Sequence, residues 1–172
     1  FSGCNNLTNV TIGTGVTSIG VEAFSSCTGL AHVAIGPGVV NIRAAAFSSC
    51  TRLADIAIPN SVTNIGGEAF AGCTSLTNVT IGAGVASIGG YAFYYCTRLA
   101  RVTIPDSVAD VWEGAFFGCA RLTHIYFQGN APNVGLDVFT GDSATVYHLP
   151  GLMGGWPPVP ELWAGKPTAL WV

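Results

Sequence analysis

A period of 23 residues runs through most of this chain of 172 residues. Phenylalanine keeps this spacing from the first residue onward, at Phe1, Phe24, Phe47, Phe70, Phe93, Phe116 and Phe139. Cysteine keeps it from Cys4 to Cys119, leucine from Leu7 to Leu122, and isoleucine from Ile12 to Ile104. A fixed period of this length is typical of stacked-repeat proteins. One unit cannot bury its apolar side chains alone, but a stack of units forms one continuous core.

Each unit predicts a short strand followed by a turn. Val10 and Ile12 alternate with polar residues, so one face of the strand is buried and the other is solvated. Strands of successive units should pair in parallel, about 4.8 Å apart. Gly or Pro residues then turn the chain into a second extended segment at 16–19, and Ala-Phe-x-x-Cys is expected to make a helical or 3₁₀ turn. The fold class is a solenoid, mainly β with little helix.

The unit at 53–73 carries the pattern Leu-x-x-Val-x-Ile-x-x-x-Val-x-x-Ile-x-x-x-Ala-Phe-x-x-Cys, with Ile at the first Val place. This pattern resembles the BspA-type leucine-rich repeat, and the resemblance covers residues 1–127. It implies a right-handed solenoid with a parallel sheet on the concave side and short strands or 3₁₀ turns on the convex side. It also implies a bacterial surface or secreted protein that is extracellular or on the cell surface. No catalytic motif and no cofactor come with the resemblance.

The chain divides into three parts. Residues 1–127 form five and a half to six repeats, residues 128–150 a degenerate terminal repeat, and residues 151–172 a Trp- and Pro-rich C-terminal cap. The strand at 144–150 fits the period if one residue is deleted, with Ala144, Tyr147 and Leu149 at the Leu, Val and Ile places. Because the chain starts inside a unit, we expect a longer protein or an N-terminal coil that packs on something else.

Charge limits the partners. Charged residues make up only 9% of the chain and the net charge is −3. The basic residues are scattered along the sequence, so we expect no basic stripe and no nucleic-acid partner. They are Arg43, Arg52, Arg98, Arg101, Arg121 and Lys166. No apolar run approaches the roughly 18 residues of a membrane span.

The cysteines predict a ladder of buried thiols. They share one place in the unit, and no Cys-x-x-Cys pair offers a zinc site. Parallel Cβ vectors on stacked coils fit a disulfide dihedral near 90° poorly. We therefore expect inert buried thiols, with no disulfide framework and no metal.

The solvated face of the predicted sheet is the first candidate site. Bulk and charge gather in its last two units, which predicts a partner-binding surface at Arg101, Thr103, His124, Tyr126 and Gln128. A plain solvated face is the alternative. His32 and Asp55 would be neighbours on adjacent strands and a His–Asp pair can orient a base, but no Ser or Cys nucleophile lies nearby on that face. We therefore predict no enzyme and no catalytic residue.

An aromatic flank is the second candidate, at Tyr91, Tyr94, Tyr95, Trp112 and Phe117. Exposed aromatic side chains mark interfaces or sugar platforms. The alternative is that the C-terminal tail folds back over this flank.

Three functions follow from these features. The first is a protein-interaction or adhesion module that binds an extracellular or cell-surface protein through the concave sheet face. The second is a carbohydrate-binding module that uses the aromatic flank and takes a polysaccharide. The third is a structural spacer or assembly unit that stacks end to end through the uncapped N-terminal coil.

Overall fold

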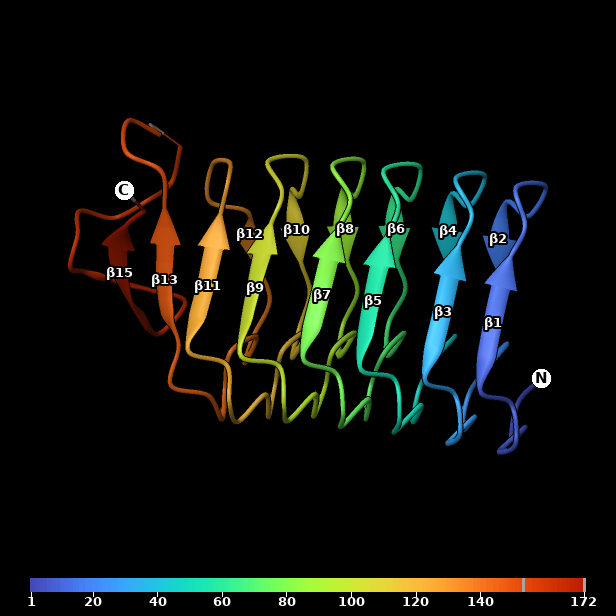
Figure 1. Cartoon of the computed structure of the whole chain (residues 1–172). Coiled ribbons are helices and arrows are strands. Elements are labelled where there is room, and N and C mark those ends of the chain that lie inside the picture. The colour runs from blue at the N-terminus through green and yellow to red at the C-terminus, as the bar shows by residue number, and fades with distance from the viewer. Residues whose placement is uncertain (153, 172) are drawn as a thin grey trace.

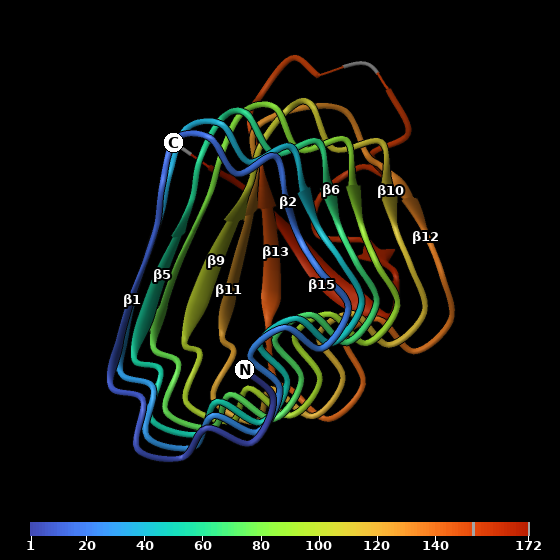
Figure 2. The same ribbon diagram turned by 90° about the vertical axis from the view of Figure 1, so that its right-hand side faces the viewer.

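The computed structural model describes residues 1–152 and 154–171. The chain forms a solenoid whose coils follow the 23-residue period (Figure 1). Each of the first six coils has a long strand in front and a short strand behind, and Figure 2 looks along the stack with these strands on opposite sides. The front strands are β1 (Asn9–Ile12), β3 (His32–Ile35), β5 (Asp55–Ile58), β7 (Asn78–Ile81), β9 (Arg101–Ile104), β11 (His124–Phe127) and β13 (Thr145–His148). The back strands are β2 (Ser18–Ile19), β4 (Asn41–Ile42), β6 (Asn64–Ile65), β8 (Ser87–Ile88), β10 (Asp110–Val111) and β12 (Asn133–Val134).

The back strands form one continuous parallel sheet, in the order β12-β10-β8-β6-β4-β2. The front strands also run in parallel, but their ladder is divided into β1-β3, β5-β7 and a last sheet that begins with β9 and β11. Both divisions lie directly before a front strand that is followed by proline, Pro59 after β5 and Pro105 after β9. At the same place in the next coil, Gln128 donates its N–H to the carbonyl of Ile104 at 3.0 Å. Proline has no N–H to donate, so this bond is missing at both divisions.

The residue types in the turn after each front strand differ between coils that pair with the preceding coil and coils that do not. Glycine stands where two coils approach closely, since a Cβ on Gly38 would lie 2.0 Å from the Thr14 carbonyl oxygen. The two turns that begin with Pro59 or Pro105 carry serine at this place instead. There Ser61 and Ser107 donate their hydroxyls to carbonyls of the preceding coil, each at 2.7 Å. The motifs Gly-x-Gly and Pro-x-Ser therefore mark paired and divided junctions.

The core lies between the two sheets and is built from the repeated apolar places. The phenylalanine rings from Phe1 to Phe139 stack from coil to coil, with centroids 5.2–5.8 Å apart. The repeated leucines from Leu30 to Leu122 are fully buried beside them. Burial of these side chains is the main stabilising term, as expected for stacked units.

The segment between a back strand and the next front strand is a series of turns. Its hydrogen bonds join residues i and i+3, as in a 3₁₀ turn, for example from Cys27 N–H to the Phe24 carbonyl at 3.2 Å. Glu22 and Ser26 have left-handed φ angles of 54° and 57°, and the same places are left-handed in later coils. These residues keep the turns separate, so no described residue forms a 3₁₀ or α-helix.

The strand of the last coil, β13, pairs in a register that differs from the predicted one. Val146 pairs with Ile125 and His148 with Phe127, so these two residues point inward and Tyr147 points outward beside Tyr126. The prediction that Tyr147 and Leu149 take the core places is therefore wrong. The strand lies 21 residues after β11 in place of 23, so two residues are missing from the period and not one.

The tail adds two strands. β14 (Leu162–Trp163) pairs antiparallel with β15 (Lys166–Leu170), and β15 pairs in parallel with β13 at the end of the front sheet (Figure 1). Trp156 and Trp163 pack on the end of the core, with ring centroids 5.1 and 5.3 Å from Phe127. These contacts cover the last apolar coil.

Candidate functional site

The predicted partner-binding residues lie together on the solvent side of the front sheet. The ladder places His124 beside Arg101 and Tyr126 beside Thr103. Gln128 follows β11 directly and lines a shallow groove with Arg101 and Thr103. Arg101 and Gln128 are exposed, whereas the other three are half-buried. A polar groove and two aromatic rings therefore share one surface.

Two aromatic residues that the sequence analysis missed extend this surface. The Tyr147 ring lies 5.0 Å from Tyr126 and 5.4 Å from His124 between centroids. Trp171 leans over Tyr126 at 5.0 Å. We call His124, Tyr126, Tyr147 and Trp171 the front aromatic cluster. Tyr147 was missed through the register error, and Trp171 because the tail leaves the period.

The predicted neighbours His32 and Asp55 lie on front strands that contact each other. His32 and Asp55 lie on β3 and β5, which belong to different ladders. Within residues 1–152 and 154–171 the one ion pair joins Lys166 and Asp142, so His32 and Asp55 form no ion pair. His124 Nδ1 lies 2.8 Å from the hydroxyl of Thr123, which orients its ring. Residues 1–152 and 154–171 hold no group of His, Cys, Asp and Glu side chains that could bind a metal ion.

The aromatic flank lies on the turn segments of two neighbouring coils. Tyr94 is central to it, with centroids 5.6 Å from Tyr91, 4.5 Å from Tyr95 and 5.6 Å from Phe117. Trp112 is 57% exposed and begins the next turn segment. The described tail residues pack on Phe127 and its neighbours at the end of the stack, which gives no support to the alternative that the tail covers this flank.

Glycines hold the tyrosine rings of the flank against the backbone. A Cβ on Gly114 would lie 2.3 Å from the Tyr91 ring, and one on Gly118 would lie 3.0 Å from the Tyr95 ring. The Tyr91 hydroxyl donates to Glu113 Oε1 at 2.8 Å. This hydrogen bond to the carboxylate raises the pKa of Tyr91. The Tyr91 ring therefore lies against the backbone of Gly114 and the Tyr95 ring against that of Gly118, each with one side toward solvent.

The repeated cysteines carry thiols of low reactivity. All six cysteines are free, and Cys4 alone is exposed. Each of the other five donates its thiol to the carbonyl of a phenylalanine in the preceding coil, at 3.1–3.3 Å. Burial raises the pKa of Cys50 and Cys119 to about 12, and it raises the pKa values of Cys73 and Cys96 as well. Nucleophilic thiolate is therefore scarce at neutral pH.

Three of the six basic residues form a row, which the sequence interpretation of scattered charge overlooked. Arg52, Arg98 and Arg121 differ by multiples of the 23-residue period and occupy one place in the coil, three residues before a front strand. All three are exposed. Subtracting their numbers would have found this row in the sequence.

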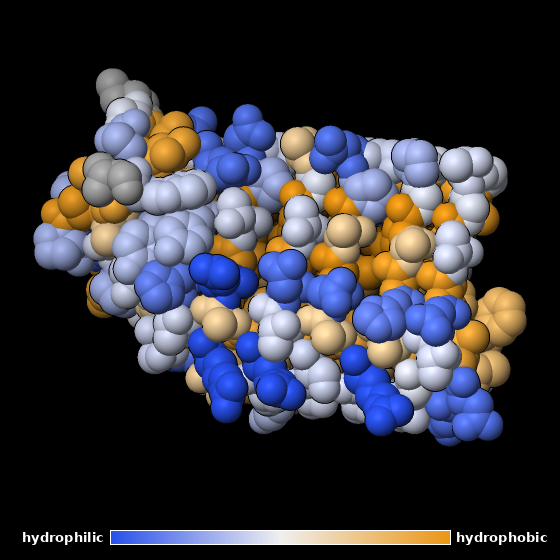
Figure 3. Space-filling model, viewed as in Figure 1, coloured by the Kyte–Doolittle hydropathy of each residue, from blue (hydrophilic) through white to orange (hydrophobic). Residues whose placement is uncertain are grey.

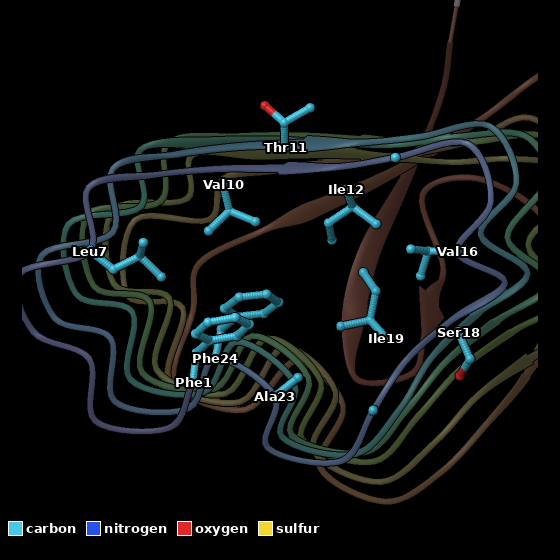
Figure 4. A pocket seen from close by; sticks show the side chains of 12 residues that line it. Phe1, Leu7, Val10, Thr11, Ile12, Val16, Ser18, Ile19, Ala23 and Phe24 are labelled. Atoms are coloured by element: carbon cyan, nitrogen blue, oxygen red, sulfur yellow. The ribbon is translucent and has the colours of Figure 1, made fainter.

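The first coil leaves an apolar hollow at the start of the stack (Figure 4). Leu7, Val10, Ile12 and Ile19 line it, together with the stacked rings of Phe1 and Phe24. Phe1 is 77% exposed.

The comparisons with known proteins agree with this geometry. The family model of the BspA type leucine rich repeat region matches in 6 copies, over residues 1–123 and 40–151. A search of curated proteins finds no match. No described segment forms a helix of the length and apolar character needed to cross a membrane.

Solved structures of bacterial repeat proteins are similar. The T. pallidum leucine-rich repeat protein superposes with a TM-score of 0.77 and 38% identity, over 82% of this chain and 66% of that one. A leucine-rich repeat protein from Eubacterium ventriosum has a TM-score of 0.70 and 20% identity, over 92% of this chain and 47% of that one, which supports the fold alone. The chain thus spans less than two thirds of the length of these proteins. The family match over nearly the whole chain shows that it belongs to the BspA-type leucine-rich repeat family.

Proposed function

We propose that this chain is a non-catalytic protein-interaction module of a bacterial surface or secreted protein. It adheres to an extracellular or cell-surface protein through the solvent side of the front sheet. Leucine-rich repeat proteins of this family generally serve as interaction modules, and this supports the proposal.

The front aromatic cluster is the observation that carries the proposal. Tyrosine, tryptophan and arginine dominate binding energy at protein interfaces because they combine a large apolar area with polar contacts. Here Tyr126, Tyr147 and Trp171 pack together, and His124 of the same cluster pairs with Arg101 on the neighbouring strand. The first strands present small residues such as Thr11 and Ala34. The interface is expected to be centred on β9, β11 and β13.

The test is immobilised binding to a panel of extracellular-matrix and bacterial surface proteins. The variant R101A/H124A/Y126A should lose at least about 30-fold in affinity for the protein that binds, as expected for truncation of interface hot spots. The matched control N9A/T11A/H32A trims the same face at the other end of the sheet and should bind like the parent. Thermal unfolding of both variants checks that the fold is kept.

Retained affinity in R101A/H124A/Y126A with a loss in the control would move the site to the N-terminal strands. Equal affinity of all three proteins would remove the front face from the proposal.

A second candidate function is carbohydrate binding on the aromatic flank. The rings of Tyr91 and Tyr95, fixed over Gly114 and Gly118, favour it because flat aromatic rings stack on sugar faces. We expect neutral oligosaccharides to quench tyrosine and tryptophan fluorescence, and the variant Y91A/Y95A to abolish this change. An unchanged signal with every neutral oligosaccharide tested would exclude the flank as a sugar site.

A third candidate is a structural spacer that assembles end to end. The apolar hollow of the first coil favours it, because an open coil can stack on another. Sedimentation should then show association that rises with concentration and falls when Phe1 is changed to Asp. A monomer at the highest concentration would argue against assembly.

A further inference from the structure

A row of arginines borders a groove below the front sheet. Arg52 and Arg98 line this groove on coils that are two apart, with Ser75 between them. Coils are spaced by about 4.8 Å, so these two arginines are about 10 Å apart along the stack, and Arg121 follows about 5 Å further on. Figure 3 shows strongly hydrophilic side chains gathered along this lower edge of the front view.

The charges of the row are available to a ligand. Over residues 1–152 and 154–171 no arginine takes part in an ion pair. Asp55, three residues after Arg52, is the one acidic residue on the front strands from β1 to β11. The row is therefore a local positive strip on a chain whose net charge is −3.

The floor of the groove is built from small residues. Gly29, Ala31 and Ala54 leave room for a chain to lie along the stack, and Thr77 contributes a hydroxyl. That hydroxyl already donates to the Ala54 carbonyl at 3.1 Å, so toward a ligand its oxygen can only accept. The groove thus offers guanidinium groups for anions and an acceptor for a hydroxyl donor.

We propose that this groove binds a linear sulfated polysaccharide that lies along the solenoid axis. Sulfate groups suit the planar fork of arginine, which gives two charge-assisted hydrogen bonds to one anion. Sugar hydroxyls supply the donors that the threonine oxygen accepts. Single-stranded nucleic acid fits less well, because its bases stack on aromatic side chains and the described lining has none. An acidic peptide lacks the hydroxyls unless it is rich in serine. This site is distinct from the front aromatic cluster.

The experiment uses a size-defined heparin oligosaccharide as the probe, in calorimetry at physiological ionic strength. The variant R52Q/R98Q/R121Q should bind heparin at least about tenfold more weakly, because charge-assisted contacts are lost. R98Q alone should lose less. The matched control R43Q removes one charge at another place in the coil, where Arg43 Nε donates to Ser18. It should bind like the parent. Binding should also weaken as salt is added, since salt screens exposed charges.

Desulfated heparin, poly-glutamate and single-stranded RNA serve as comparison ligands, and each should bind at least about tenfold more weakly than heparin when anion and hydroxyl contacts act together. Absence of heparin binding at physiological ionic strength would overturn the proposal. So would an equal loss in R43Q and R98Q, or equal affinity for poly-glutamate or RNA, which would indicate charge attraction without a glycan site. The variant R101A/H124A/Y126A should keep heparin affinity, so failure of the front-face function leaves this test unaffected.

Discussion

Alkaline pH should unfold this protein through its buried thiols. Burial raises the pKa of the Cys119 thiol from 9.0 to about 12, because the charged thiolate is poorly solvated in the core. Burial raises the pKa values of Cys73 and Cys96 too, and nearby cysteines in adjacent coils add to the effect. In the unfolded chain these thiols return to ordinary solvation and ionise near pH 9.

The sign and size of the effect follow from linkage between protonation and folding. The folded pKa lies above the unfolded one, so the contribution of each thiol to stability is complete below pH 9 and is lost as the pH rises toward 12. For Cys119 the loss is about 1.4 kcal/mol at pH 10 and about 2.7 kcal/mol at pH 11. The pKa values of Cys73 and Cys96 shift in the same direction, so these thiols add to the loss, which for Cys119 alone is already a sizeable share of a typical domain's 5–15 kcal/mol.

Urea denaturation followed by circular dichroism at a series of pH values measures this loss. The midpoint should be flat from pH 7 to about 8.5 and then fall steeply, because several protons are released together on unfolding. Thiolate absorbance should rise together with unfolding, because the buried thiols reach water only when the chain unfolds. Cys4 is exposed and lies outside this buried set. The variant C4S should leave the curve unchanged. Equal stability at pH 8 and pH 10.5, or full thiolate absorbance in a folded protein, would refute the reasoning.

Three substitutions test the packing of the coils, each by urea denaturation. Phe70→Ala removes a fully buried ring from the stack and should destabilise by about 3–5 kcal/mol; a loss below about 1 kcal/mol would mean that the stack collapses around the gap. Gly84→Ala places a Cβ 2.0 Å from the Asn60 carbonyl oxygen and should destabilise by about 1–3 kcal/mol, unless the coils spread apart. Lys166→Met leaves the buried Asp142 carboxylate without its partner at 2.7 Å and should destabilise by about 3–5 kcal/mol. The double variant with Asp142→Asn should recover part of that loss, and no recovery would show that Lys166 acts through packing alone.

The division between β7 and β9 falls next to Arg101, and the shallow groove that Arg101 shares with Thr103 and Gln128 also touches β7. Pro105 follows β9 directly and has no N–H to donate to the preceding coil. It therefore lies at the division that borders the proposed interface.

The sequence by itself determined the coil and its core. The 23-residue period repeats the same apolar places, and stacking identical places is the way in which a short unit buries them, so the columns of Phe and Leu predicted the fold directly. The same arithmetic contained the row of Arg52, Arg98 and Arg121. It also placed Arg101 beside His124, because parallel strands in register bring residues one period apart together.

Only the tertiary structure decided the end of the stack. Alternation over 144–149 allows two registers that differ by one residue, and hydropathy favours Tyr147 and Leu149 inside. The register that forms buries His148, whose ring stacks on Trp156 at 4.7 Å. This contact joins the last coil to the tail, which has no period to predict it. The front aromatic cluster depends on the same long-range packing, because Tyr147 faces outward only in this register and Trp171 reaches Tyr126 only after β15 has paired with β13.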